Sequence, residues 1–300
     1  MIRILTQILL IALVLLPLAT LAYQEKADES LNIVVVFAHP DDGEVKMGAT
    51  AAMMAEAGHR VKFVSITNGS AGHQELGGGN LGTIRRAEAQ EAARRMGIDE
   101  YVVLDNNDGE LTPELHVRMD VIREIRNWNA DAVFGHRPWD YHPDHRYSGV
   151  LVQDAAYMVG VPNLASDTPP LENNPVFFYL SDGFEKPYPF SYDIVIGIDS
   201  HIETKGRVLD AHASQVYEWL PWISGRHEVP ESSDARFEWL MEHRLSGGNV
   251  SEGQRASLAK WYGEDLASTF QHVESFEICE YGRTPTDEEI RQIFPIQGQD

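Results

Sequence analysis

Two clusters of histidine and carboxylate side chains each follow directly after a short apolar run of the sequence. The first is Ala38–Glu44 (AHPDDGE), and the second is His136–His145 (HRPWDYHPDH). In an open α/β sheet, ligands bind outside the carboxyl ends of the strands, so we expect both clusters at the mouth of one sheet. Turns and helix starts explain the acidic and proline residues of these clusters, but they leave the histidines unexplained. The two clusters together therefore predict a metal site.

The ligands of that metal are expected to be histidine and carboxylate, because Cys279 is the only cysteine of the chain. A single cysteine excludes an intrachain disulfide and a cysteine-based zinc site. A catalytic zinc ion usually has three protein ligands and keeps one position for a water, whose pKa it lowers. In the two clusters, His39, Asp42 and His145 supply such a set.

The remaining polar side chains of the clusters suit acid and base catalysis. Hydrolysis of an amide needs a base that activates water and an acid that protonates the departing amine, and Asp41 and His142 are available for these roles. Asp144 is expected to orient one of the imidazoles. If His142 caps a helix that begins at Pro143, its ring projects from the same helical turn as that of His145. The residues are those of a metal-assisted hydrolase.

The chain alternates apolar runs with amphipathic stretches from Asn32 onward, which is typical of β-α-β units. Strands are expected at 33–37, 61–66, 101–104, 132–135, 176–180 and 194–198, and helices at 44–57, 84–97 and 113–128. Beyond Pro162 the pattern weakens, and the other segments are expected to be mostly helical. The predicted fold class is α/β, with a Rossmann-like, largely parallel sheet flanked by helices. A core at 32–215 is expected to precede a more helical C-terminal extension at about 216–300.

The N-terminus carries a targeting pattern. Arg3 precedes an apolar stretch from Ile8 to Ala22, which is typical of a secretory signal peptide over residues 1–22. A periplasmic or extracellular location is expected, with no stable membrane partner once the signal is cleaved. An uncleaved anchor is the alternative, although the apolar run is near or below the ~20 residues that span a bilayer.

The overall composition is that of a globular chain and limits the possible partners. The 300 residues are 43% hydrophobic, and 46 acidic against 24 basic side chains give a net charge of −22. This balance argues against an extended cationic surface for nucleic acid or anionic lipid. The acidity is also expected to repel anionic glycans and to favour neutral or cationic ones.

Four motifs in order, AHPDDGE, TNGSAG, IRRAEAQEAARRMGI and HPDH, resemble the PIG-L/LmbE family of N-acetylglucosaminyl-type deacetylases. The resemblance spans roughly residues 32–160, with a shorter echo at 212–215 (HASQ). It implies a single LmbE-like deacetylase domain over 30–300, a zinc-type divalent ion, and hydrolysis of an N-acetyl group on a sugar amine. It also implies roles that agree with those above: the ligands are His39, Asp42 and His145, the general base is Asp41, and the residue that stabilises the oxyanion or protonates the amine is His142.

The resemblance implies further residues near the substrate. Arg85 matches an arginine that can approach the substrate in the family, although an exposed ion pair with Glu88 explains it equally well. Gln215 and His212 are expected to border the pocket. Glu44 fits a version of the first motif in which the acid follows a small residue, and we expect it to support the site or to cap the helix.

Two other segments have both a functional and a structural interpretation. The glycine-rich segment 68–82 lacks the spacing of a phosphate-binding loop, so we expect a mobile substrate loop or plain flexibility. The aromatic stretch 217–222 (YEWLPW) could offer a platform to a sugar, but packing is the more frequent explanation.

The function that we expect is a zinc-dependent hydrolase, or one using another divalent metal ion, that removes an N-acetyl group from an N-acetylated amino sugar or glycoconjugate. Its partner would be a small-molecule or glycan substrate that carries this group. Two alternatives remain at this stage, a metal amidohydrolase that acts on a non-sugar acylated amine and a non-catalytic carbohydrate-binding relative. The sequence carries no signal for the oligomeric state.

Overall fold

The computed structural model describes residues 30–226, 228–248 and 250–296. The expected signal peptide at residues 1–22 lies outside the described residues. Among the helices of the described ranges, none combines the length and the apolar character needed to cross a membrane.

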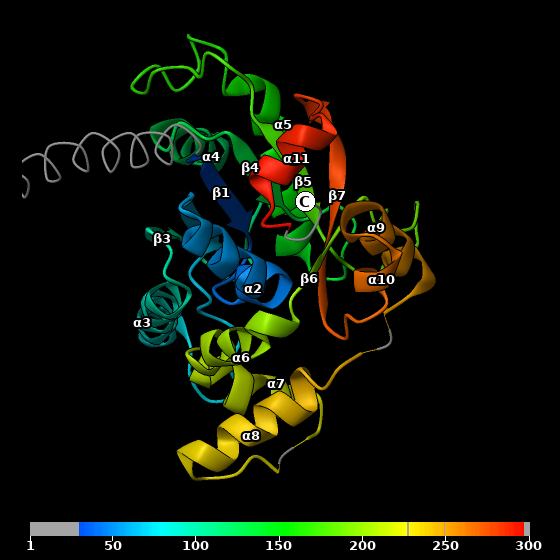
Figure 1. The fold of residues 1–300 in the computed structure, drawn as a ribbon. Helices are drawn as coiled ribbons and strands as arrows, with labels where there is room; N and C mark the ends of the chain where they lie inside the picture. The colour runs from blue at the N-terminus through cyan, green and yellow to red at the C-terminus, as the bar shows by residue number, and fades with distance from the viewer. Residues whose placement is uncertain (1–29, 227, 249, 297–300) are drawn as a thin grey trace, which may run out of the picture.

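A seven-stranded sheet forms the centre of the molecule (Figure 1). Its strands are β1 (Asn32–Phe37), β2 (Arg60–Thr67), β3 (Glu100–Asn106), β4 (Ala132–Gly135), β5 (Val176–Leu180), β6 (Ile194–Gly197) and β7 (Val273–Gly282). The order is β3-β2-β1-β4-β5-β7-β6; β7 pairs antiparallel with both neighbours, and the other pairs are parallel. The expected α/β fold with a largely parallel sheet is confirmed.

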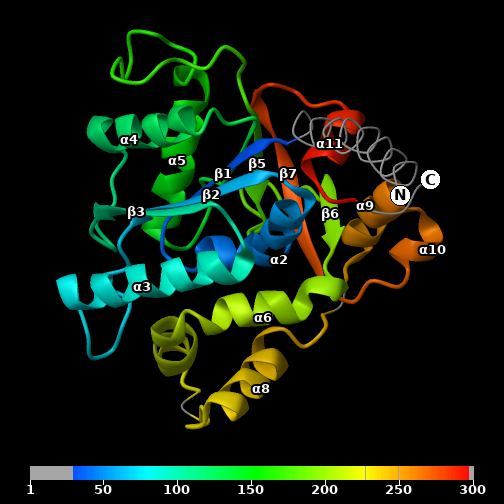
Figure 2. The same ribbon diagram turned by 60° about the vertical axis from the view of Figure 1, so that its left-hand side comes forward.

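Helices cover both faces of this sheet (Figure 2). They are α2 (Asp42–Ala57), α3 (Gly78–Met96), α4 (Leu115–Asn127), α5 (Pro143–Met158), α6 (Ile202–Asp210), α7 (Leu220–Ile223), α8 (Ser233–Arg244), α9 (Glu252–Tyr262), α10 (Glu264–Ala267) and α11 (Asp287–Ile293), with a 3₁₀ turn η1 (Asp199–His201) and a π-helical turn η2 (Ser214–Trp219). From β1, Val35 packs in the core layer of α2 and α3, and Val36 packs in that of α4 and α5. A strand buried on both faces explains the unbroken apolar run of β1.

The strand order reverses at β1, which lies between β2 and β4. The chain leaves β1 through α2 to one side and reaches β4 on the other side. In α/β sheets, such a switch point opens a crevice at the carboxyl ends of the two strands. The segments after β1 and β4 are the two clusters of histidine and carboxylate residues, so the fold brings them to one place.

Strand β7 was missed by the sequence analysis, which expected the region beyond residue 216 to be mostly helical. Its sequence VESFEICEYG places Glu274 and Glu277 among apolar residues, and both carboxylates are buried. Each has a partner from a distant segment: Lys205 Nζ lies 2.6 Å from Glu274, and the Ser191 backbone N–H donates to Glu277 over 2.9 Å. Partners of this kind are invisible in a local pattern, so the run does not resemble a buried strand.

Helix α3 begins at Gly78, six residues before the expected helix at 84–97. The C-terminal part of the glycine-rich segment 68–82 is therefore the first turn of a helix and not a loop. Its glycines weaken the helical signal, because glycine is among the poorest helix formers. Only the first part of the segment, before Gly78, is available to line a site.

Candidate active site

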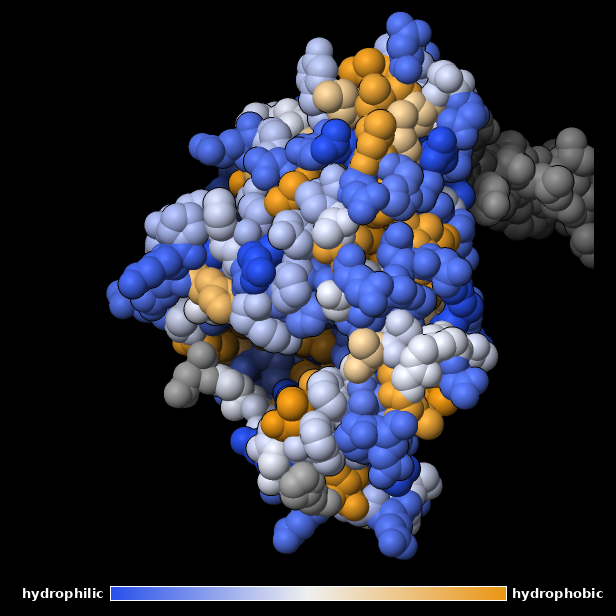
Figure 3. Space-filling model, turned by 180° about the vertical axis from the view of Figure 1, so that it is seen from behind, coloured by the Kyte–Doolittle hydropathy of each residue, from blue (hydrophilic) through white to orange (hydrophobic). Residues whose placement is uncertain are grey.

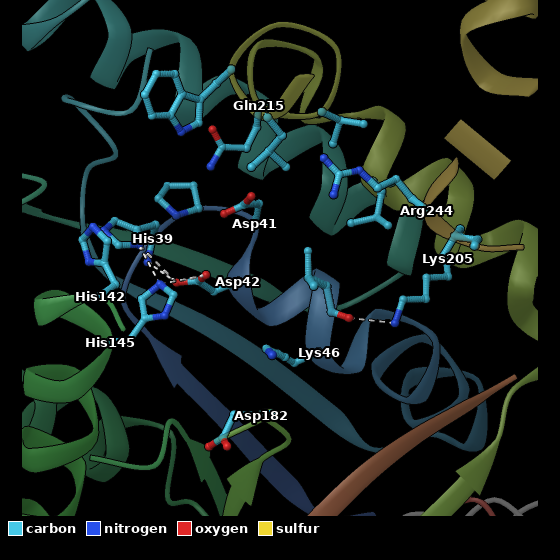
Figure 4. Close-up of a pocket in the computed structure, with 18 of the residues that line it drawn as sticks. His39, Asp41, Asp42, Lys46, His142, His145, Asp182, Lys205, Gln215 and Arg244 are labelled. Carbon is cyan, nitrogen blue, oxygen red and sulfur yellow. Dashed lines mark hydrogen bonds and ion pairs between the residues drawn. The ribbon is translucent and has the colours of Figure 1, made fainter. Parts of the chain in front are cut away.

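The turn after β1 places three polar side chains at the entrance of α2. The backbone N–H of His39 donates to Asp42 Oδ2 over 2.8 Å, which closes the turn. Asp41 is the N-cap residue and has a φ of 116°, a conformation that non-glycine residues rarely adopt. Backbone strain of this kind clusters at functional sites. Figure 4 shows Asp41 and Asp42 with their carboxylates on the cavity side of the turn.

The three residues predicted as metal ligands converge on one point. His39 Nδ1 lies 3.2 Å from His145 Nε2 and 3.3 Å from Asp42 Oδ2, and His145 Nε2 lies 3.3 Å from Asp42 Oδ1. Four ligands at about 2.0–2.1 Å from a tetrahedral zinc ion are about 3.3–3.4 Å from each other. The separations of the three ligand atoms therefore fit a tetrahedral ion.

More ligands than three are available around this point. Three overlapping groups of histidine and carboxylate side chains could each hold an ion: His39, His142 and His145; Asp42, His136 and His145; and His39, Asp108 and Asp144. All of them contain His39 or His145, so they form one cluster and not separate centres. Because the cluster has only nitrogen and oxygen donors, it suits zinc or another borderline divalent ion.

Carboxylates fix the orientation of both imidazoles. His39 Nε2 lies 3.0 Å from Asp108 and 3.2 Å from Asp144, and His145 Nδ1 lies 3.0 Å from Asp140. In each ring the other nitrogen is thereby directed to the shared point, as in metal sites where a carboxylate holds the ligating histidine. Asp144 is fully buried behind His39 and is not part of the cavity wall. Its place fits the expected orienting role better than direct contact with substrate.

The electrostatics of the cluster favour a cation. Burial opposes protonation of His39, but hydrogen bonds to Asp108, Asp144 and Asp42 outweigh it and raise its pKa well above the usual value. Burial has the same opposing effect on His145, and Asp42 and Asp140 raise its pKa to about 9. The neighbouring histidines hold the pKa of Asp42 well below its usual value, despite burial. The carboxylates that raise these pKa values create a negative potential, and the same potential favours a divalent ion that would displace the histidine protons.

Asp41 differs from its neighbour Asp42. Burial and the charge of Asp42 raise its pKa to about 7, whereas His212 and Arg85 lower it. A carboxyl group with a pKa near neutrality in a cleft is a candidate general base. Beneath it, His212 Nε2 and Glu44 Oε1 form a fully buried pair at 2.7 Å. The expected pocket position of His212 is wrong, because this pair lies behind the cavity wall and supports it.

His142 is the N-cap of α5, as predicted, and Pro143 follows it in the first turn. Its Nδ1 accepts a hydrogen bond from the backbone N–H of Asp144 over 3.2 Å. Burial and the charges of His39 and His145 lower the pKa of His142, so the ring is neutral at neutral pH. Because Nδ1 accepts, the proton of the neutral ring is on Nε2, which makes His142 a hydrogen-bond donor.

A cavity of about 1010 Å³ opens next to this cluster, and residues from both halves of the chain line it. Figure 3 shows this side of the molecule hollowed between the main body and the lobe that contains α8. The cavity wall includes five of the predicted ligands and catalytic residues, namely His39, Asp41, Asp42, His142 and His145. The volume is at the upper end of the range for sites that hold drug-sized ligands.

The two predicted substrate-binding residues also line the cavity. Arg85 is 1% exposed, and its guanidinium donates to the Gly72 carbonyl over 2.7 Å, whereas its Nε has no partner among the residues that the structure describes. Glu88 instead accepts from the Ser214 backbone over 2.7 Å, so the alternative of an exposed Arg85–Glu88 pair is wrong. Gln215 points its amide toward Asp41 (Figure 4), and its buried Oε1 has no partner. Both side chains retain hydrogen-bonding capacity for a ligand.

In the aromatic stretch 217–222, some residues pack in the interior and others face the cavity, so both the packing and the sugar-platform interpretations apply. Tyr217 is buried and donates to Asp210 over 2.7 Å, which is a packing role. Trp219 lines the cavity and stacks on the exposed Trp222 with ring centroids 5.5 Å apart. The first part of the glycine-rich segment also reaches the cavity, through Gly69, Ala71 and Gly72. One face of the site therefore offers an aromatic surface beside exposed backbone.

Sequence reasoning missed several residues of this site. Asp108 follows the end of β3 at the same edge of the sheet, so the strand-end rule that identified the two main clusters would have found it. Asp140 lies within the second cluster, but it received no role. For Lys46 and Arg244, which line the cavity from α2 and α8, the sequence offers no signal.

The arrangement matches a known family. The family model described as "PIG-L: GlcNAc-PI de-N-acetylase" matches residues 34–156, the segment that supplies every residue of the metal cluster. The matched segment, residues 34–156, is similar to this family and is called the PIG-L domain below. The far part of the cavity wall, including Gln215 and Arg244, comes from outside this PIG-L domain.

Individual relatives extend the similarity beyond the PIG-L domain. The diacetylchitobiose deacetylase of Thermococcus kodakarensis is 29% identical over 246 residues, which cover 77% of this chain and 85% of that protein. The solved N,N′-diacetylchitobiose deacetylase of Pyrococcus horikoshii is 25% identical, with a TM-score of 0.61 over 83% of this chain and 84% of that chain.

A second solved structure shows the same fold in a protein named for a different activity. The 4-carboxy-2-hydroxymuconate hydratase of Pseudomonas putida KT2440 has a TM-score of 0.63 at 17% identity, over 85% of this chain and 98% of that chain. At this identity the likeness concerns the fold alone. Because one fold hosts several reactions, the activity has to be argued from the site.

Proposed function

We propose that this protein is a divalent-metal-dependent hydrolase that removes the N-acetyl group from an N-acetylated amino sugar or a small glycoconjugate. The observation that carries the proposal is the convergence of His39 Nδ1, His145 Nε2 and the Asp42 carboxylate within 3.3 Å of each other, beside Asp41. The names of the relatives, which are diacetylchitobiose deacetylases, support the substrate class. The two-histidine, one-carboxylate set supports zinc as the ion.

The chain's own residues account for the proton transfers of amide hydrolysis. An ion held by His39, Asp42 and His145 supplies Lewis acidity for the acyl carbonyl and acidifies a water. Asp41 takes the proton of the attacking water, and its raised pKa of about 7 suits a base that must later release that proton. Transfer of the proton to the departing nitrogen yields the amine and acetate.

His142 and the residues of the opposite wall complete the site. The Nε2–H of neutral His142 is a donor for the oxygen that becomes negative as the carbonyl is attacked. Arg85 Nε and Gln215 Oε1 are a free donor and a free acceptor, which suit the hydroxyl groups of a sugar. The aromatic face of Trp219 suits the apolar face of a sugar ring.

The test combines metal analysis with acetate release from methyl N-acetylglucosaminide. We expect the purified protein to contain about one zinc ion per chain, to lose activity on chelation and to regain it with zinc. Asp42→Asn is expected to lose both metal and activity. Asp154→Asn changes the same side-chain type on the exposed face of α5, in an ion pair with Arg118, and is expected to keep both.

Two results would overturn the proposal. Acetate release that is unaffected by chelation and by Asp42→Asn would exclude the metal mechanism. If the metal-loaded protein released acetate from N-acetylated amino acids but from no N-acetylated sugar, a non-sugar amidohydrolase would replace it.

A further inference from the structure

Lys46 and Arg244 stand on the cavity wall without an acidic partner among the described residues. Lys46 projects from α2, one turn after Asp42, and Arg244 is the last residue of α8. Both line the cavity, and within the part of the chain that the structure describes no carboxylate oxygen lies within 4.0 Å of either charged group. In a chain with 46 acidic and 24 basic side chains, cations usually find an acidic neighbour. Cations left free at a cavity are therefore candidates for ligand binding.

The acidic residues of the same wall are already neutralised. Asp182 accepts two hydrogen bonds from Arg137, over 2.7 and 3.0 Å, and lines the cavity. At the metal cluster, Asp108 and Asp140 face His39 and His145. The carboxylates that remain, Asp41 and Asp42, belong to the catalytic point itself.

Two further cations line the wall, Arg85 and Lys205. Arg85 is 1% exposed and its charge acts on Asp41, so it belongs to the catalytic end of the cavity. Lys205 Nζ lies 2.6 Å from Glu274 and donates to the Val45 carbonyl over 2.8 Å, so its charge is already paired. Lys46 and Arg244 thus differ from Lys205 and Arg137, whose charges are paired with Glu274 and Asp182. An anion entering the cavity would find its partners in the first two.

Arg244 also lies close to the reaction centre. Figure 4 shows its guanidinium on the cavity side, between Asp41 and Lys205. Burial and the charge of Arg226 lower the pKa of Arg244, whereas Asp41 raises it, which reflects their proximity. Leu240 and Leu245 line the same part of the cavity. Arg244 itself is exposed, so an ion pair formed there is open to screening by salt.

We propose that the substrate carries an anionic group, a carboxylate or a phosphate, on the part of the molecule that retains the nitrogen, and that Arg244 and Lys46 bind this group. This inference rests on the deacetylase function proposed above and specifies its substrate. The cavity is large enough to hold more than one sugar ring, which leaves room for such an aglycone. This proposal differs from the expectation, drawn from the acidic composition, that the protein would disfavour anionic glycans.

The experiment uses a matched pair of substrates, the carboxymethyl and the carbamoylmethyl glycosides of N-acetylglucosamine, which differ in charge but hardly in shape. For the zinc-loaded full chain we expect kcat/KM to be about tenfold higher for the carboxylate, mainly through a lower KM. This preference is expected to fall as salt is added, because screening weakens exposed ion pairs. N-acetylglucosamine 1-phosphate, assayed in parallel, distinguishes phosphate from carboxylate as the preferred anion.

Single substitutions identify the side chains that cause the preference for the anionic glycoside. Arg244→Gln is expected to remove most of it and Lys46→Gln part of it, with kcat for the uncharged glycoside changed less than twofold. Lys260→Gln removes an equal charge from the exposed face of α9, where Lys260 pairs with Asp287, and is expected to keep the full preference. All variants are checked for an unchanged melting temperature and zinc content.

The outcomes separate this inference from the proposed function. Hydrolysis of the uncharged glycoside with no preference for the anionic ones would overturn the inference and leave the deacetylase function in place. A preference that survives in both Arg244→Gln and Lys46→Gln would also overturn it. Failure to hydrolyse any of these glycosides would count against the proposed function itself.

Discussion

The two ends of the cavity are built from different parts of the fold and by different means. At the metal end, loops after β1, β3 and β4 carry histidines and carboxylates, and both ring nitrogens of His39 and of His145 have partners. At the other end, α6, α8 and the segments around them contribute mostly aliphatic side chains, together with Arg244, which has no acidic partner in the described ranges.

This difference suggests separate roles for the two ends, one in the reaction and one in substrate selection. Groups that interlock at strand ends are held rigidly, as reaction chemistry requires. A wall of helices and loops outside the PIG-L domain can differ in shape and charge without disturbing the metal cluster. We therefore expect the metal end to determine which bond is broken and the helical end to determine which substrate is accepted. Substitutions at the metal end should therefore affect all substrates alike.

The largest effect is expected at Asp41. Asp41→Asn should lower kcat by about 10²–10⁴-fold on every substrate while zinc remains bound, because it removes the general base and leaves the ligands in place. Asparagine is suited to the test, since it tolerates a positive φ better than most residues. Acetate release measured with anionic and uncharged glycosides checks whether the loss is uniform.

Asp154→Asn is the control for this change, and its rates should match those of the unmodified chain. If Asp41→Asn slowed one substrate severely and left another near normal, the division between reaction and selection would be wrong. Loss of zinc in Asp41→Asn would instead assign Asp41 to the metal.

A smaller effect is expected at Asp140, which lies behind a ligand. Asp140→Asn weakens the acceptor of the His145 Nδ1 hydrogen bond and should lower zinc affinity by about 10–100-fold. Competition with a chelator measures this affinity, and excess zinc should restore most of the activity. If the variant bound zinc normally but stayed inactive at saturating zinc, Asp140 would act on the reaction and not on the metal.

The sequence was sufficient for the metal end because its signals are local. His39, Asp41 and Asp42 follow an apolar strand directly, and His142 and His145 flank a proline at a helix start. These relations lie within ten residues. The six expected strands were found for the same reason, since each is a short apolar run in its own right.

The helical end could not be predicted because its side chains interact with residues that are far away in the sequence. Glu44 pairs with His212, 168 positions away, and the partner of Lys205 lies in the missed strand β7. Buried charges make a segment look exposed until the partner is known. Arg244 has no local pattern at all, and only the cavity shows which way it faces.

The smallest catalytic effect, and a large effect on stability, is expected where the two ends are joined. Helix α2 is kinked at Met47, and there Glu274 accepts from the Ala49 and Thr50 backbone over 3.2 and 2.7 Å, while Lys205 donates to the Val45 carbonyl. The buried ion pair thus satisfies backbone groups at the kink. An inserted side chain is a known cause of such kinks.

Lys205→Met should lower the free energy of unfolding by about 3–5 kcal/mol, because it leaves the buried Glu274 carboxylate without a counter-charge. Adding Glu274→Gln should recover part of that loss, since the amide oxygen can still accept from α2 without carrying charge. Denaturant unfolding of the single and double variants measures this coupling. Assayed well below its melting temperature, Lys205→Met should keep kcat within about threefold and keep the preference for anionic glycosides. A lost preference with unchanged stability would place Lys205 beside Arg244 as a substrate contact, and the boundary between the two ends would shift toward α6.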